Sequence, residues 1–167
     1  GSIIYTGGDP SLGKINKAGH IVWKHTSGKL NFLGTSELKV SPDGSKVWFD
    51  FEHEHQSSGK ITKGKAGWDL STQSLLKAAS NDLQSPRQKA GRLNVTDWEG
   101  GEKPKLNGKL LPLRKYEASR SLDFTRDGRS FALGTGWYLR YFEADGQQRW
   151  QIHTPVVWKV NISQNGR

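Results

Sequence analysis

The sequence predicts an all-β fold, and three observations lead to that prediction. A strand–turn–strand unit recurs along the chain, 20 of the 167 residues are glycine, and apolar residues follow the spacing of a strand rather than of a helix. Alternation of apolar and polar residues gives a strand one buried face. Glycine supplies the positive φ that tight turns require. With 33% hydrophobic residues, including seven tryptophans, the chain has enough apolar material for a core.

The first recurring unit consists of two short strands joined by a turn that ends in Asp-Gly or Asn-Gly. It occupies 38–49 around Asp43-Gly44 and 122–133 around Asp127-Gly128, and it begins again over 160–167 around Asn165-Gly166. Such turns are typical of tight hairpins, because glycine adopts backbone conformations that other residues avoid. The apolar residues flanking the turns at alternating positions are expected to be buried: Leu38, Val40, Val47, Phe49, Leu122, Phe124, Phe131, Leu133 and Ile162.

A second unit has the form apolar–turn–apolar and occurs over 15–23, 68–75 and 141–150. The turns at Asp127 and Asn165 are 38 residues apart, whereas those at Asp43 and Asp127 are 84 apart. The larger spacing fits two periods or one period with a long insertion. We prefer the insertion, because 81–105 is polar and rich in glycine, proline and lysine. A period of about 40 residues built from short strands is typical of β-propeller blades.

The predicted architecture is therefore an incomplete ring of about three to four propeller blades. The whole chain, 1–167, is expected to be a single propeller segment, in which 1–23 end a partial blade, 36–75 form a blade, 93–150 form a blade with an insertion, and 155–167 start a further blade. An open ring would expose unpaired strand edges, which natural folds avoid. The missing strands are therefore expected to come from another fragment or another chain.

Several of these segments resemble the WD-repeat propellers. Ser41-Pro42-Asp43-Gly44 matches their hairpin turn, and Trp68-Asp69 matches the dipeptide that names the family. The later part of the chain resembles a bacterial WD-repeat subgroup often joined to caspase-like peptidase domains. The segments that carry this resemblance are 95–98, 106–111, 133–140, Trp150 and 158–163. The resemblance covers roughly residues 36 to 167 and implies a propeller that acts as a protein-interaction scaffold.

The chain is strongly basic, with 25 Lys and Arg against 16 Asp and Glu and a formal net charge of +9. A positive surface attracts nucleic acid, anionic lipid or an acidic partner. Lys60, Lys63 and Lys65 are the candidate polyanion-binding residues. The alternative is that these lysines lie on solvated loops and strand edges, where they prevent edge-to-edge pairing. Between Lys103 and Arg120 there are six basic residues and a single acidic one, Glu117.

No catalytic site, metal site or cofactor is expected. The chain contains no cysteine, which excludes thiolate metal ligands and a cysteine nucleophile, and leaves the compartment open with the cytoplasm favoured. On a strand over 52–55, His53 and His55 would share one face, but the sequence offers no third ligand nearby. No apolar run approaches the ~20 residues of a membrane span, so no membrane partner is expected.

The aromatic residues give the candidate sites for a protein partner. Trp98 and Trp137 lie beside predicted turns, and Tyr138 and Arg140 follow in a dense cluster. Exposed Trp, Tyr and Arg are typical of binding hot spots. On a strand, Tyr138 and Arg140 would share one face, and Leu139 and Tyr141 the other. The predicted function is a non-catalytic interaction scaffold with an unidentified protein partner; the alternative is a module that binds nucleic acid or another polyanion.

Overall fold

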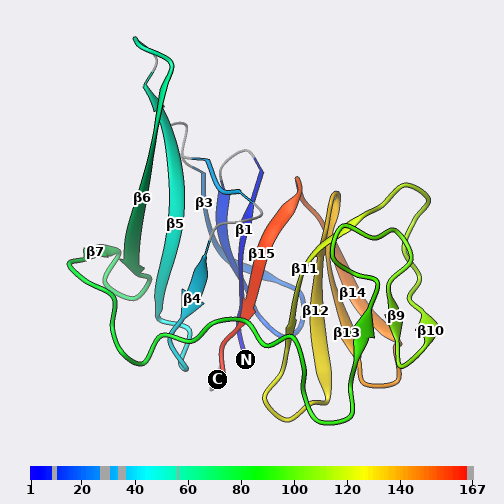
Figure 1. The fold of residues 1–167 in the computed structure, drawn as a ribbon. Helices are drawn as coiled ribbons and strands as arrows, with labels where there is room; N and C mark the ends of the chain where they lie inside the picture. Colours follow the sequence, from blue (N-terminus) through cyan, green and yellow to red (C-terminus); the bar gives the residue numbers. More distant parts are fainter. Residues whose placement is uncertain (9–10, 27–30, 34–36, 56, 165–167) are drawn as a thin grey trace.

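The computed structural model describes residues 1–8, 11–26, 31–33, 37–55 and 57–164, so the expected turn at Asn165 and Gly166 lies outside the described residues. Every regular element in the described part of the chain is a β-strand, and the strands form four antiparallel sheets (Figure 1). The predicted all-β class is confirmed. No helix among the described residues is long and apolar enough to cross a membrane.

We number the sheets 1 to 4 by their lowest strand. Sheet 1 has the order β15 (Val157–Ile162), β1 (Ile3–Gly7), β2 (Ser11–Ile15) and β3 (Ile21–Thr26). Sheet 2 is a meander of β4 (Leu38–Val40), β5 (Lys46–His55), β6 (Lys60–Asp69) and β7 (Ser74–Leu76). Sheet 3 is small and comprises β8 (Val95–Thr96), β9 (Lys105–Leu106) and β10 (Lys109–Leu110). Sheet 4 is a second meander, of β11 (Ser119–Phe124), β12 (Ser130–Thr135), β13 (Tyr138–Glu143) and β14 (Gln148–His153).

Sheet 1 is built from both ends of the chain, which lie close together in Figure 1. β1 pairs with β15 in antiparallel register, with Ile3 opposite Ile162 and Tyr5 opposite Val160. Beside this pairing, the Ser2 amide donates to Ser163 Oγ at 2.9 Å. The segments 1–23 and 155–167, which the sequence pattern treats as separate partial blades, thus contribute strands to one sheet. The strand beside β15 comes from the same chain.

The hairpin turns owe their shape to an aspartate and a glycine. Gly44 and Gly128 have φ values of 71° and 63°, as the turn chemistry predicts. Asp43 Oδ1 accepts hydrogen bonds from the Ser41 hydroxyl at 2.6 Å and from the Ser45 amide at 3.0 Å. These bonds, led by the one from Ser41, lower the pKa of Asp43 to about 2. The turn therefore closes on an ionised carboxylate that satisfies its own backbone donors.

Three apolar clusters hold the sheets together in the order 2–1–4–3. One cluster joins sheets 2 and 1, a second joins sheets 1 and 4, and a third joins sheets 4 and 3. On β1, Ile3 and Tyr5 face sheet 4 whereas Ile4 faces sheet 2, because successive side chains point to opposite faces. All nine residues predicted to be core are buried, each at most 6% exposed. Sheets 1 and 4 are covered on both faces.

Gly134 on β12 allows sheet 4 to approach sheet 1 closely. A Cβ at this position would overlap the Ser121 hydroxyl and would lie 2.6 Å from Val157 Cγ1. We expect Gly134→Ala to lower the free energy of unfolding by about 1–3 kcal/mol, because overpacking a dense interior forces neighbours to move. Gly136→Ala is the matched control, since its Cβ would meet nothing closer than 3.9 Å. Urea denaturation of both variants measures the difference, and equal stabilities would contradict this packing argument.

The polar segment expected as an insertion runs across three sheets before it forms sheet 3 (Figure 1). Gln84 exchanges backbone hydrogen bonds with Val40 of β4, and the Arg87 amide donates to Asp123 of β11. Further along, Asn107 and Gly108 form the two-residue hairpin that their sequence predicts, with φ values of 49° and 86°. The strands β4 and β11 are thereby tied together by one segment, 84–87, which is also bonded to β15 because Asn161 Nδ2 donates to the Gln84 carbonyl.

Candidate functional site

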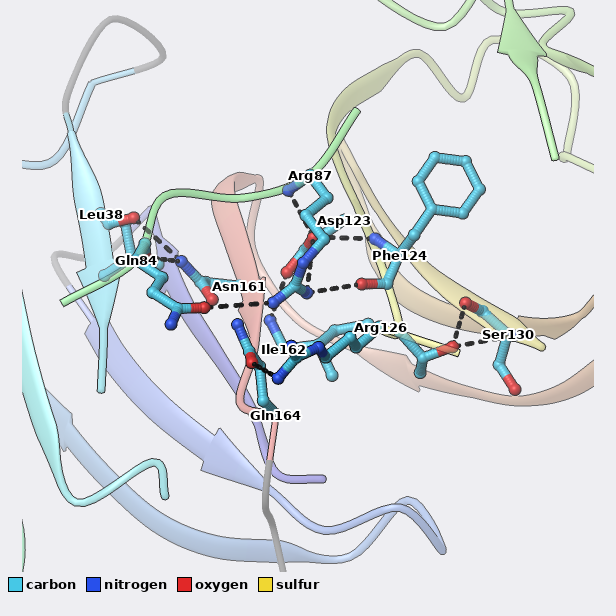
Figure 2. A network of polar contacts seen from close by, with 11 residues as sticks. Leu38, Gln84, Arg87, Asp123, Phe124, Arg126, Ser130, Asn161, Ile162 and Gln164 are labelled. Carbon is cyan, nitrogen blue, oxygen red and sulfur yellow. Dashed lines mark hydrogen bonds and ion pairs between the residues drawn. The ribbon is translucent and has the colours of Figure 1, made fainter. Parts of the chain in front are cut away.

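A buried polar network lies where β4, β11 and β15 meet (Figure 2). Asp123 accepts backbone N–H bonds from Arg87 at 2.5 Å, from Phe124 at 2.8 Å and from Ile162 at 2.5 Å. The Arg87 guanidinium also donates to the Phe124 carbonyl at 2.9 Å. Asn161 donates from Nδ2 to the carbonyls of Gln84 and Leu38, at 2.7 and 3.2 Å. Three sheets and the crossing segment thus share one set of hydrogen bonds.

Asp123 is fully buried within this network. Burial raises the pKa of its carboxyl to about 7, against the opposing pull of the Ile162 and Arg87 amides and of the Arg87 charge. Removal of the charged form from water dominates because a carboxylate loses its hydration in the interior. Because Asp123 is fully buried, its role is structural, and the candidate site is the cavity beside it.

A cavity of about 330 Å³ adjoins the network and is lined by residues of β4, β11 and β15. Its walls come from β4, β11, β15 and the segments 85–88 and 98–99; the lining residues include Glu37, Trp98, Glu99, Arg120 and Lys159. Two carboxylates, two cations and one indole ring therefore line the same cavity. The Arg120 guanidinium also lies 6.0 Å from the centre of the Trp158 ring. An aromatic surface with charges of both signs suits a polypeptide segment, which offers both signs and apolar side chains.

The four residues predicted to bind a protein partner do not gather on one surface. Trp98 lines the central cavity and is half-buried, and Trp137 is 44% exposed in the turn between β12 and β13. Tyr138 and Arg140 are only 8% and 2% exposed. The expectation that these two side chains reach a partner needs correction, because both faces of sheet 4 are covered.

Arg140 is buried because it neutralises Glu117. Its guanidinium donates to both carboxylate oxygens of Glu117, at 2.8 and 2.6 Å, and also donates to Gln148. Thr135 Oγ1 donates to the same carboxylate at 2.6 Å. Burial opposes ionisation, yet these bonds lower the pKa of Glu117 below its ordinary value. The feature of the sequence that could have indicated this buried ion pair is Glu117 itself, the only acidic residue among six basic ones in 103–120.

The three lysines predicted to bind a polyanion lie on β6 and are exposed. Lys63 forms an ion pair with Glu52 at 3.0 Å, and Lys65 forms ion pairs with Asp50 and Glu37 at 3.3 and 3.4 Å. Asp50 and Glu52 lie on β5 directly opposite Lys65 and Lys63. The row is therefore not an uncompensated positive surface: cross-strand register places a carboxylate beside two of the three ammonium groups, and only Lys60 differs in this respect.

His53 and His55 share one face of β5, as their spacing predicts. Their rings are 4.7 Å apart in an edge-to-face arrangement, and His55 Nε2 lies 3.2 Å from the Thr62 hydroxyl. Within the described ranges, no three His, Cys, Asp or Glu side chains are grouped so as to hold a metal ion. The histidine pair is thus accounted for by contacts within the β5–β6 hairpin.

Comparison with protein-family models finds no match for this chain, and comparison with curated proteins finds none either. Among solved structures, the chain is similar to one described as "Crystal structure of the eukaryotic initiation factor", with 9% sequence identity and a TM-score of 0.27. The match covers 87% of this chain and 39% of that chain, so this chain spans well under half of the other. A likeness at this TM-score carries no argument about the fold or the function of this chain.

Proposed function

We propose that this chain is a non-catalytic protein-interaction module of the WD-repeat propeller type, and that a partner segment binds in the central cavity. The observation that carries the proposal is the convergence of β4, β11 and β15 on a cavity lined by Trp98, Arg120 and two carboxylates. Indole and guanidinium groups in a concave site contribute most of the binding energy at many interfaces. The charges of both signs fix the direction of an extended peptide.

Three four-stranded antiparallel sheets stacked face to face support the propeller part of the proposal. In a propeller, each blade is such a sheet and the inner strands surround a central opening. Here β4, β15 and β11 are the first strands of their sheets and are tied to one another around the cavity. The resemblance of 36–167 to WD-repeat sequences agrees with this arrangement.

A peptide library displayed on phage and selected on the full chain tests the proposal. We expect the selected peptides to lose about tenfold or more in affinity when Arg120→Glu reverses the charge in the cavity, and a similar factor with Trp98→Ala, because both side chains line the site. Fluorescence anisotropy of the labelled peptides gives the dissociation constants.

Leu75→Ala is the control, because Leu75 is exposed on β7 and lies outside the cavity lining. The unfolding temperature of each variant is also measured, because Trp98 packs against the core cluster between sheets 4 and 3 and its loss could destabilise the fold. Arg120 is exposed, so its variant tests the cavity without that complication. Selected peptides that bind both cavity variants as tightly as the wild type would refute the proposal.

A module that binds nucleic acid remains the second candidate function, on the strength of the net charge of +9. Titration of the chain with a duplex oligonucleotide at 50 and 200 mM salt distinguishes a nucleic-acid-binding module from a protein-interaction module. Phosphate contacts release counterions, so affinity that falls steeply with salt would favour the polyanion hypothesis. We expect weak binding even at low salt, because Lys63 and Lys65 are already paired.

A further inference from the structure

We propose a second docking surface, distinct from the central cavity, that binds an acidic, extended peptide segment. The surface consists of Arg114, Lys115 and Tyr116 from the loop before β11 and Trp137 from the turn between β12 and β13; we name it the Tyr116–Trp137 surface. Tyr116 is 66% exposed and Trp137 is 44% exposed. Exposed aromatic rings beside basic side chains are typical of peptide-binding surfaces.

Buried polar contacts lock the two loops of this surface together. The Gly136 amide donates to the Ala118 carbonyl at 2.9 Å, and the Thr135 hydroxyl donates to Glu117 at 2.6 Å. The same Thr135 oxygen accepts the Trp137 amide at 3.3 Å. Glu117, which follows Tyr116 in one loop, is thus hydrogen-bonded to Thr135, which in turn accepts the amide of Trp137 in the other loop. A rigid base of this kind keeps both rings presented before a partner arrives.

Tyr116 is the third residue of a turn in which the Glu117 amide donates to the Arg114 carbonyl at 3.1 Å, and this position favours glycine or asparagine. Its φ is 65°, in the left-handed region that an aromatic residue rarely adopts. The other non-glycine residues with positive φ in the described part of the chain are polar: Gln73, Asp97 and Asn107. The left-handed conformation is unfavourable for a residue that carries a Cβ. Burial of the Tyr116 side chain does not offset this cost, because the side chain is mostly in solvent. The turn accounts for the backbone conformation but not for an exposed tyrosine at a position that favours glycine, and this choice of side chain points to a role in recognition.

The charges select the class of partner. Arg114 lies 4.7 Å from the centre of the Tyr138 ring, and the Lys115 ammonium lies 4.9 Å from the centre of the Tyr116 ring. Neither cation has an ion-pair partner among the described residues. Glu117, the acidic residue of the loop, is fully buried against Arg140. The surface is therefore positive and complements a carboxylate-bearing peptide.

A peptide fits this surface better than a nucleic acid does. Single-stranded nucleic acid is bound along a groove whose basic side chains follow about 4 to 16 nucleotides. Among the described residues, the Tyr116–Trp137 surface has two cations without an ion-pair partner, and both lie in the loop that carries Tyr116. Two cations and two rings match a short stretch in which acidic residues alternate with residues that stack on aromatic rings, such as proline.

The test uses a fluorescein-labelled decapeptide of alternating glutamate and proline, which adopts an extended conformation before it binds. We expect it to bind the full chain, and a decapeptide of alternating lysine and proline not to bind. Tyr116→Gly and Trp137→Ala are each expected to weaken binding about tenfold. Arg120→Glu is expected to leave this binding unchanged, so a failure here is distinguishable from a failure of the central cavity.

Tyr116→Gly also separates recognition from structure. Glycine adopts φ near 65° without strain, so this variant is expected to unfold at the same temperature as the wild type or higher. Loss of binding with unimpaired stability would support the surface as a recognition site. Unchanged binding by Tyr116→Gly, no binding of the acidic peptide, or tighter binding of a labelled oligothymidine than of the acidic peptide would each overturn the proposal.

Discussion

Replacement of Asp123 by alanine is expected to lower the free energy of unfolding by about 3–5 kcal/mol, because three buried amides lose their acceptor and each orphaned donor costs about 1–3 kcal/mol. The amides belong to Arg87, Phe124 and Ile162, so the crossing segment, β11 and β15 all lose the same anchor. Urea denaturation followed by tryptophan fluorescence at pH 6 measures the loss.

The control for this variant is Asp127→Ala, four residues further along. Asp127 is exposed at the hairpin turn, where its carboxylate accepts the Arg129 amide at 3.1 Å. Water replaces that lost bond, so we expect this variant to lose no more than about 1 kcal/mol. A comparable loss in the two variants would show that Asp123 is not the common anchor of the segment 84–87, β11 and β15.

Asp123 also gives the folded state a particular pH dependence. Its pKa is raised from 3.8 to about 7 by burial, so between these values the folded chain binds a proton that the unfolded chain has released. The contribution of Asp123 to stability is therefore fully present below about pH 4 and is lost as the pH rises through 7. The difference in stability between wild type and Asp123→Ala is expected to narrow from pH 5 to pH 8. A constant difference would contradict the raised pKa.

Truncation of Arg140 to alanine is the second change with a large expected effect. It leaves the Glu117 carboxylate buried without its counter-charge, and breaking a buried ion pair in this way costs about 3–5 kcal/mol. The lost contacts are two guanidinium hydrogen bonds to Glu117 and one to Gln148. Guanidinium chloride would screen this interaction, so the measurement is thermal or urea unfolding at low salt.

Arg149→Ala is the matched control for the Arg140 variant. Arg149 also pairs with a carboxylate, Glu143, at 2.7 Å, but its side chain is 57% exposed. Exposed pairs contribute about 0–1 kcal/mol, so the two arginines are expected to differ several-fold in effect. A double variant, Glu117→Gln with Arg140→Met, removes both buried charges and is expected to recover part of the stability. Equal losses for Arg140 and Arg149 would refute the assignment of Glu117–Arg140 as a buried pair.

The stability that the Glu117–Arg140 pair contributes changes with pH in the opposite direction from the stability that Asp123 contributes. The pKa of Glu117 is lowered in the folded chain, so its contribution is present above the ordinary pKa of a glutamate and is lost as the pH falls through the lowered value. Acid unfolding of the wild type is therefore expected to begin below the pH range in which Asp123 titrates. Arg140→Ala removes the bonds that lower the pKa of Glu117, so protonation relieves its unpaired buried carboxylate. The loss of stability caused by Arg140→Ala is therefore expected to shrink as the pH falls through the ordinary pKa of a glutamate.

The sequence by itself determined the local parts of the fold. The turn at Asp43-Gly44, the turn at Asp127-Gly128 and the hairpin at Asn107-Gly108 form as predicted, because each depends on residues within a few positions of one another. The nine core residues were predictable for the same reason. The alternation of apolar and polar side chains along a strand fixes which face is buried, whatever the partner of that face is.

Only the tertiary structure decided how those parts combine. The pairing of β1 with β15 joins residues about 160 positions apart, and no local pattern specifies such a partner. Tyr138 and Arg140 were expected at a surface because alternation shows that a strand has two faces but not that both are covered. Asp123 and Glu117 become anchors only when distant amides or a distant guanidinium surround them, since a carboxylate is held in the interior by its neighbours in space rather than by its neighbours in the chain.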